Sequence, residues 1–117
     1  MTLESLIKKW FACWECGDLN NLPISKKFTH SSPFGTIESK QSYLELVNNN
    51  KDKFLNYKFT IHDTIYNKNK ACVRYTATQE DFELDVSEWY YVKNNYIEKI
   101  IAYYHIGDIK EERLLNS

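Results

Sequence analysis

The 117-residue sequence has only three glycines and two prolines. Low-complexity and collagen-like chains contain far more of both residues, so neither class fits. Uninterrupted apolar runs are short, as in IIAYY, and none approaches the length that a bilayer requires. The first ten residues, MTLESLIKKW, hold a glutamate and two lysines where a signal peptide needs an unbroken apolar stretch. We therefore expect a soluble, cytoplasmic protein with no membrane contact.

No charge of one sign predominates. The chain has 15 lysines and arginines against 16 aspartates and glutamates, for a formal net charge of −1. A protein that binds nucleic acid usually presents a basic surface to the phosphate backbone. We therefore expect no nucleic-acid partner.

Cysteines are few and odd in number: Cys13, Cys16 and Cys72. An odd number argues against a closed disulfide framework and suits a reducing compartment. Cys13 and Cys16 form a CxxC motif, which redox sites and zinc knuckles also use. The motif lies within a helical pattern, and a zinc site would need a second ligand pair. We favour helix packing over redox or zinc chemistry, and expect no metal and no cofactor.

Aromatic residues are abundant, with nine tyrosines, six phenylalanines and three tryptophans. Buried rings supply much of the apolar area that stabilises a core. A chain of this length is of the usual size for one domain and needs no disulfide or metal to hold its core. We predict a single domain over residues 1–117.

The first part of the chain predicts two helices and a short strand. Residues 3–14 carry apolar side chains at the three-and-four spacing of one helix face, with Thr2 placed to cap the start and Gly17 to end it. Residues 26–32 form a short strand that Pro33 stops. A second helix starts near Ser39, which can cap it. Its inward side chains are Tyr43, Leu44 and Val47.

From residue 57 the apolar period changes to two, which indicates strands. Four strands are expected, at 57–66, 71–79, 82–92 and 96–106, joined by the short turns NKNK, QED and KNN. Connections this short give an antiparallel meander. Helices followed by a long sheet predict the α+β class, with one face of a curved sheet wrapped around the helices.

Alternation assigns an inner, mostly apolar face to these strands. Glu88 interrupts that face with an acid, and the alternation of its own strand places Asp63 there too. A lone carboxylate among rings has its pKa raised by the loss of water, so Glu88 is a candidate functional residue. The alternative is a structural carboxylate satisfied by tyrosine hydroxyls and backbone amides. The other inner residues are Tyr57, Phe59, Ile61, Ile65, Val73, Tyr75, Ala77, Phe82, Leu84, Val86, Tyr90, Val92, Ile100, Ala102 and Tyr104.

The opposite face is expected to carry an apolar band that is too large for the surface of a monomer. We predict that this band forms a homodimer interface, while His62 and His105 lie on the same outer face. The band consists of Trp89, Tyr91, Ile97, Ile101 and Tyr103.

Three segments together resemble a known superfamily. A helix carrying W-x-x-x-W-x-x-G-D-L, a strand running into HSSPFGT and the closing SEWYYVKNNYIEKIIAYYH are similar to the NTF2-like superfamily, and within it to the SnoaL-like domains. The similarity covers residues 6–109. It implies a cone, in which the sheet curls around the N-terminal helices and leaves a pocket near the Pro-Phe-Gly turn. The same scaffold serves isomerases, cyclases, dehydratases, epoxide hydrolases and proteins without catalysis, so the fold does not settle the function.

The resemblance also implies where catalytic groups of relatives would fall. The general-base aspartate of the ketosteroid isomerases corresponds to Ser32, their oxyanion tyrosine to Trp10, and their protonated aspartate to Glu88. The last-strand acid of the cyclases and epoxide hydrolases corresponds to Ala102. Serine is no base and an indole has no hydroxyl, so isomerisation of the steroid type is not expected.

Two candidate catalytic residues remain, His30 and Glu88. An imidazole of near-neutral pKa facing a desolvated carboxylate suits general acid and base chemistry on a small apolar substrate. The first hypothesis is a binding domain for such a molecule, which could act as a cofactor-free isomerase, cyclase or lyase. The alternative is a non-catalytic dimerisation or ligand-sensing module, in which His30 only packs. The expected pocket lining is Trp10, Trp14, Ser32, Phe34, Tyr43, Phe59, Tyr75, Tyr90, Ala102 and Tyr104.

Overall fold

The computed structural model describes residues 2–105, so the last part of the fourth predicted strand lies partly outside the described residues. The first helix, α1 (Leu3–Cys16), begins and ends where its sequence predicts. The Thr2 hydroxyl accepts a hydrogen bond from the Ser5 amide, and Gly17 adopts a left-handed φ of 73° that closes the last turn. Only glycine takes that conformation without strain. The predicted apolar stripe faces inward, with Trp10, Phe11 and Trp14 buried.

The remaining elements confirm the α+β class. The sheet has six strands in the order β2-β1-β6-β5-β4-β3, and it is mixed because β1 runs parallel to β6 while all other neighbours are antiparallel. The elements that follow α1 are the 3-10 turn η1 (Leu19–Asn21), β1 (Ile24–Ser32), β2 (Gly35–Glu38), α2 (Lys40–Asn48), α3 (Lys51–Phe54), β3 (Lys58–Asn67), β4 (Lys70–Gln79), β5 (Phe82–Lys93) and β6 (Tyr96–Tyr103).

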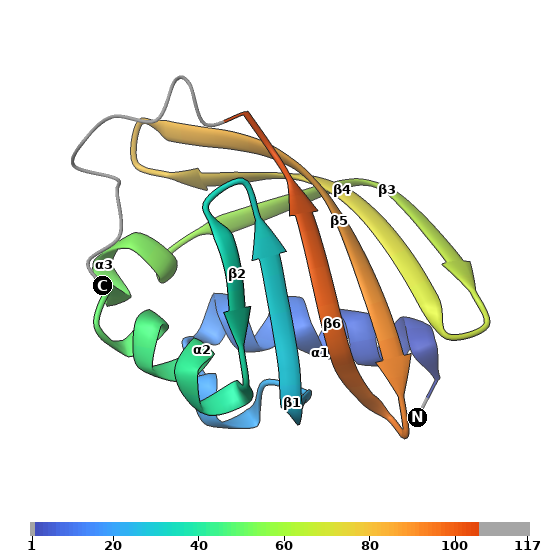
Figure 1. Cartoon of the computed structure of the whole chain (residues 1–117). Helices are drawn as coiled ribbons and strands as arrows, with labels where there is room; N and C mark the ends of the chain where they lie inside the picture. The colour runs from blue at the N-terminus through green and yellow to red at the C-terminus, as the bar shows by residue number, and fades with distance from the viewer. Residues whose placement is uncertain (1, 106–117) are drawn as a thin grey trace.

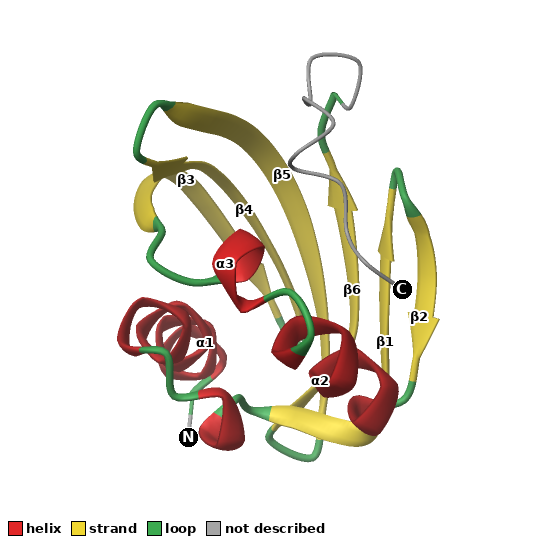
Figure 2. Ribbon diagram, turned by 90° about the vertical axis from the view of Figure 1, so that its left-hand side faces the viewer, coloured by secondary structure: helices red, strands yellow, loops and turns green. Residues whose placement is uncertain are grey.

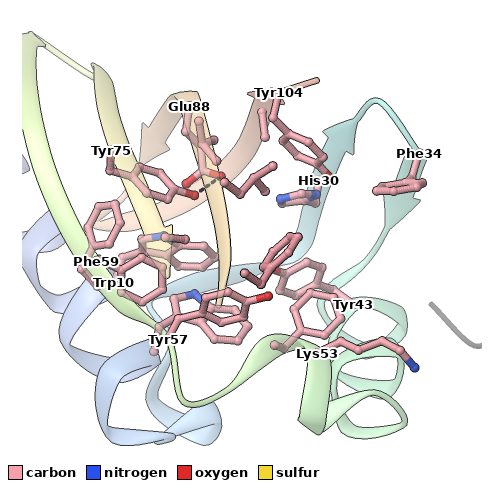
Figure 3. A pocket seen from close by; sticks show the side chains of 18 residues that line it. Trp10, His30, Phe34, Tyr43, Lys53, Tyr57, Phe59, Tyr75, Glu88 and Tyr104 are labelled. Carbon is pink, nitrogen blue, oxygen red and sulfur yellow. Dashed lines mark hydrogen bonds between the residues drawn. The ribbon is translucent and has the colours of Figure 1, made fainter. Parts of the chain in front are cut away.

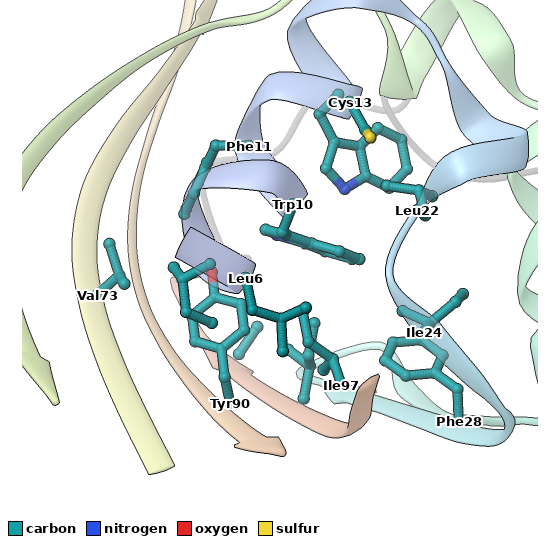
Figure 4. Close-up of a cluster of buried hydrophobic side chains, with 14 of the residues drawn as sticks. Leu6, Trp10, Phe11, Cys13, Leu22, Ile24, Phe28, Val73, Tyr90 and Ile97 are labelled. Atoms are coloured by element: carbon teal, nitrogen blue, oxygen red, sulfur yellow. The ribbon is translucent and has the colours of Figure 1, made fainter. Parts of the chain in front are cut away.

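The sheet curves around the helices and forms a cone (Figures 1 and 2). Helix α1 crosses the concave face, while α2 packs against β1 and β2, and α3 packs against α2. Trp10 lies at the centre of the core, near Tyr90 and Phe28, with ring centroids 6.3 Å away in each case. Figure 4 shows this cluster, in which Phe28, Tyr90 and Ile97 are completely buried. Burial of these large rings is the main stabilising contribution here.

The strand β2 is not expected from the sequence. Pro33 and Phe34 form a tight turn that folds β2 back on β1, with Gly35 at a φ of 125° opposite Ser32. The hydroxyls of Ser31 and Thr36 lie 2.9 Å apart across this hairpin. β1 begins at Ile24, two residues earlier than predicted. After the hairpin, the Ser39 hydroxyl accepts from the Ser42 amide, which confirms its predicted role as the cap of α2.

A β-bulge in β3 reverses the expected parity of its second half. The register shifts between Ile61 and Asp63, so that Tyr66 packs against the core and Ile65 is 68% exposed. One extra residue in a strand moves every later side chain to the other face. Asp63 therefore does not interrupt the inner face, because it lies outside and accepts a hydrogen bond from Arg74 Nε at 2.7 Å.

A second irregularity, between Tyr91 and Val92, corrects the predicted outer band. Ile97 pairs with Val92 and is fully buried, so it belongs to the core. Trp89 and Tyr103 do lie on the exposed side, at 41% and 59% of their surface. Tyr91 and Ile101 share that side and are partly buried. Together, Trp89, Tyr91, Ile101 and Tyr103 form the outer patch.

Of the CxxC pair, Cys13 fits the packing interpretation and Cys16 does not pack. Cys13 is buried and its thiol donates to the Asn21 carbonyl at 3.5 Å, while Cys16 is exposed. Burial raises the pKa of Cys13, with Asp18 adding to the rise. A redox CxxC needs a lowered thiol pKa. Over residues 2–105 no cluster of ligand side chains could hold a metal ion, and no helix is long and apolar enough to cross a bilayer.

Candidate functional site

A cavity of about 180 Å³ lies between the concave face of the sheet and the three helices. Eighteen residues line it, and eleven of them are phenylalanine, tyrosine or tryptophan (Figure 3). Both candidate catalytic residues, His30 and Glu88, are on its wall. Of the expected lining, the structure places there Trp10, Trp14, Phe34, Tyr43, Phe59, Tyr75, Ala102 and Tyr104.

Two expected lining residues lie behind the wall. Tyr90 is fully buried and reaches the cavity only through its hydrogen bond to Glu88. Ser32 hydrogen-bonds to Tyr104 and accepts the Phe34 amide at 3.2 Å, so it holds the rim in place. Neither residue is among those that line the cavity.

The helix α3 supplies lining residues that the sequence reasoning missed. Lys53 and Phe54 follow the second predicted helix in the sequence, and only the folded chain brings them over the cavity. Phe54 stacks on Trp14, with ring centroids 6.1 Å apart. Phe11 is expected in the core rather than on the cavity. Five further lining residues belong to the inner face that alternation predicts: Tyr57, Ala77, Phe82, Leu84 and Val86.

Glu88 is a buried carboxylate in the middle of β5, only 4% exposed. Its Oε2 accepts a hydrogen bond from the Tyr75 hydroxyl at 3.1 Å, and its Oε1 accepts one from the Tyr90 hydroxyl. Burial raises the pKa of Glu88 to about 7, although hydrogen bonds from Tyr90, Tyr75 and Trp10 lower it in part. Among the described residues no basic side chain pairs with this carboxylate. It is therefore a proton donor or acceptor poised near neutral pH.

The tyrosines around Glu88 remain protonated at physiological pH. Burial, and then the negative charge of Glu88, raises the pKa of Tyr75, Tyr90 and Tyr43 well above 10. Tyr75 and Tyr90 therefore act as fixed hydroxyl donors toward the carboxylate. Such donors stabilise its ionised form and hold its orientation.

His30 lies in the middle of β1 and is partly buried. Its ring packs on Tyr43 and Phe28, with centroids 5.2 and 6.4 Å away. Burial lowers the pKa of His30 to about 4, while a hydrogen bond to its own backbone raises it slightly. At pH 7 the ring is therefore neutral. In the described part of the chain no hydrogen bond joins it to Glu88, although Figure 3 shows both on the same cavity.

The positions that the resemblance singled out have no steroid-isomerase machinery. Ser32 occupies the general-base position, and Trp10 offers an indole N–H in place of a phenol hydroxyl. Ala102, at the position of the last-strand acid, presents only a methyl group to the cavity. Glu88 is thus the titratable group best placed for proton transfer, and its surroundings differ from those the resemblance implies.

Comparison with solved structures identifies the fold. No family model matches the chain, and no curated protein matches it by sequence. An NTF2-like protein of unknown function from Cytophaga hutchinsonii superposes with a TM-score of 0.79 at 17% identity, over 91% of this chain and 92% of that one. The chain has the NTF2-like fold.

Two further solved structures are similar to this chain. A candidate ketosteroid isomerase from Kribbella flavida has a TM-score of 0.75 at 14% identity, over 97% of this chain and 87% of that one. A SnoaL-like protein of unknown function from Burkholderia thailandensis has a TM-score of 0.69 at 16% identity, over 87% and 92%. At identities this low, the superpositions establish the NTF2-like architecture but not the chemistry, which has to be argued from the site.

Proposed function

We propose that this NTF2-like protein binds a small, largely apolar molecule in its conical cavity. The observation that carries the proposal is the aromatic wall of a cavity of about 180 Å³ with a buried carboxylate on it. An apolar cavity of about 150 Å³ is enough to hold a benzene molecule. Each Å² of apolar surface that the ligand buries contributes about 25 cal/mol. The cavity therefore suits a ligand built around one ring.

Cavity filling tests this proposal. Ala77 lines the cavity on β4, so Ala77→Leu reduces the volume without adding a polar group. Thr60→Leu is the matched control, because Thr60 is exposed on the neighbouring strand β3. We expect calorimetry to show that Ala77→Leu weakens binding of p-cresol about tenfold or more, and that Thr60→Leu leaves it unchanged. Equal affinity in both variants would place the ligand elsewhere.

Proton transfer at the bound ligand is a second candidate function, as in a cofactor-free isomerase, cyclase or lyase. The pKa of Glu88, raised to about 7 by burial, supports it, because catalysis is most efficient when the pKa lies near the working pH. His30, neutral at pH 7, would orient the ligand through a hydrogen bond. If no proton is transferred, the same cavity serves a non-catalytic, ligand-sensing module.

Deuterium exchange separates these two alternatives. Cyclohexanone in D₂O exchanges its α protons when a base removes them, and NMR follows the loss of signal. If Glu88 acts as the base, the protein accelerates exchange, Glu88→Gln abolishes the acceleration, and Glu83→Gln retains it. Glu83 is the matched control because it is exposed on the same strand. An unchanged rate with Glu88→Gln would exclude Glu88 as the base.

The aromatic and aliphatic side chains of the outer patch support the proposal that the protein is a homodimer. Trp89 and Ile101 are paired across β5 and β6, and Tyr103 lies beyond them on the same face. Exposed apolar groups of this size usually mark a protein interface. We expect light scattering at micromolar concentration to give twice the chain mass, and Trp89→Lys to give the monomer. A monomeric mass for the unmodified protein would contradict the proposal.

A further inference from the structure

The cavity combines many ring faces with a single buried carboxylate. Figure 3 shows Glu88 on the wall, with Tyr75, Trp10 and Phe59 on one side of it and Tyr104 and His30 on the other. The ring pairs Trp10–Trp14 and Phe59–Tyr75 have centroid distances of 5.5 and 5.7 Å. Rings on this wall therefore contact one another in pairs.

This wall attracts positive charge. The face of an aromatic ring carries partial negative charge, so a cation within about 6 Å of the ring centre is stabilised, most strongly when water is excluded. Enclosures made of several such rings are the usual recognition sites for quaternary ammonium groups. Eleven aromatic residues line this cavity, and several of them are buried, including Trp10, Trp14 and Tyr43.

Glu88 adds a buried carboxylate to the same enclosure, and this group carries its negative charge above its pKa of about 7. A buried carboxylate is normally paired with a basic side chain, because an isolated buried charge is costly. Over residues 2–105 Glu88 receives tyrosine hydroxyls but no lysine, arginine or protonated histidine. Its hydroxyl donors hold the two oxygens in place without neutralising them. A positively charged ligand could therefore supply the counter-ion that Glu88 lacks.

The other charged or basic groups at the cavity do not oppose a cationic ligand. His30 is neutral at pH 7, so it contributes a polar but uncharged ring. Lys53 belongs to the rim, and Figure 3 shows its ammonium group directed away from Glu88 and toward the outside. Water screens the repulsion of a charge directed outward in this way.

We propose that the cavity binds an organic cation, a tertiary or quaternary ammonium group carried on a small apolar ring, with Glu88 as its counter-ion. The inference rests on the proposed function, since it names the class of ligand that the cavity takes. A neutral apolar ligand would leave the Glu88 carboxylate in an apolar contact without a charge partner. An anionic ligand would place two negative charges together.

An isosteric pair of probes tests the charge directly. Phenyltrimethylammonium and tert-butylbenzene have nearly the same shape and differ by one positive charge. We expect the cation to bind the unmodified protein about tenfold more tightly or better, as measured by calorimetry for the cation and by competition for the neutral probe. Benzoate, as an anionic probe of similar ring size, should not bind measurably.

Two variants then assign the preference to its residues. Glu88→Gln should remove most of the preference for the cation while leaving tert-butylbenzene binding within about threefold. Glu83→Gln, on the exposed side of the same strand, is its control and should change neither probe. Phe54→Leu removes an aromatic ring that lines the cavity and stacks on Trp14. It provides a second test if Glu88→Gln folds poorly, and it should weaken the cation more than the neutral probe.

The possible outcomes distinguish failure of the organic-cation inference from failure of the proposed apolar binding site. Tighter binding of the cation, lost in Glu88→Gln, supports both. If tert-butylbenzene binds as well as or better than the cation, and Ala77→Leu blocks it, the cavity binds apolar ligands and the cation inference is wrong. If neither probe binds the folded protein, the proposed function fails, and the inference fails with it.

Discussion

The two titratable residues of the cavity should give the protein stability opposite responses to pH. Burial raises the pKa of Glu88 from 4.5 to about 7, so unfolding releases its proton between these pH values. The free energy of unfolding therefore falls as pH rises from about 4.5 to 7 and is level above 7. At 1.36 kcal/mol per pKa unit, the total loss is about 3 kcal/mol.

His30 works in the other direction. Burial lowers its pKa from 6.5 to about 4, so unfolding takes up a proton between these values. The free energy of unfolding therefore rises as pH increases from about 4 to 6.5, by up to about 3 kcal/mol. Between pH 4.5 and 6.5 the two contributions oppose each other, so the free energy of unfolding of the unmodified protein shows neither of them separately.

Single variants should show how each residue changes the free energy of unfolding with pH. Relative to the unmodified protein, we expect Glu88→Gln to gain about 3 kcal/mol of stability between pH 4.5 and 7, and His30→Gln to lose a similar amount between pH 4 and 6.5. Urea unfolding followed by tryptophan fluorescence measures both, because Trp10 and Trp14 are buried. All other titrating groups cancel in the difference.

Exposed residues provide the controls for this experiment. Glu83→Gln and His62→Gln remove the same groups from the outer face, where both side chains are exposed. They show what loss of the same side chain does at an exposed position, and the curves of Glu88→Gln and His30→Gln are compared with theirs. If the curves of Glu88→Gln and His30→Gln run parallel to that of the unmodified protein, neither residue titrates as the structure implies, and the reasoning is refuted.

Four further substitutions test the packing of the fold. Tyr90→Phe removes a hydroxyl donor from a carboxylate, so it should cost about 2 kcal/mol at pH 8 and less at pH 5, where Glu88 is protonated; equal losses in urea unfolding at both pH values would contradict this. Gly17→Ala should cost about 1 kcal/mol in the same assay, because its φ of 73° strains any side chain; no change would contradict this. Phe28→Ala should cost about 4 kcal/mol, since Phe28 is fully buried, and Phe34→Ala much less, since Phe34 is 46% exposed; similar losses would contradict this.

The helices and most strands could be predicted because local signals fix them. Thr2 and Gly17 bound α1 by capping chemistry, and Ser39 starts α2 for the same reason. The short turns between β3, β4, β5 and β6 follow from polar residues that interrupt alternation. β2 escaped notice because its four residues, GTIE, have no clear alternation and are stabilised by pairing with β1 at the sheet edge.

Register was the part that sequence alone could not determine. The bulge between Ile61 and Asp63 has no signature in the residues themselves, so strict alternation placed Ile65 on the wrong face. Ile97 was misplaced because parity cannot carry across the irregularity next to Val92. Where the ladder is regular, as from Val86 to Tyr90, alternation identified the buried carboxylate correctly.

The site shows the same division between local and tertiary information. Glu88 could be singled out because a charged residue on an apolar face is a local conflict. The lining from α3 could not, since the contact of Phe54 with Trp14 depends on how the chain crosses the cone. The low pKa of His30 also depends on tertiary packing, against Tyr43 and Phe28.

Glu88 is a group that the fold itself does not need. A leucine at this position would keep the alternation of β5 and avoid the loss of about 3 kcal/mol that burial of the carboxylate causes above pH 7. Two tyrosine hydroxyls and an indole instead surround it and limit that loss. His30, on the same cavity, stays uncharged at neutral pH. Among the described lining residues Lys53 points away from Glu88, so the carboxylate has no cationic partner on the wall. A cationic ligand would recover the stability that the ionised carboxylate loses.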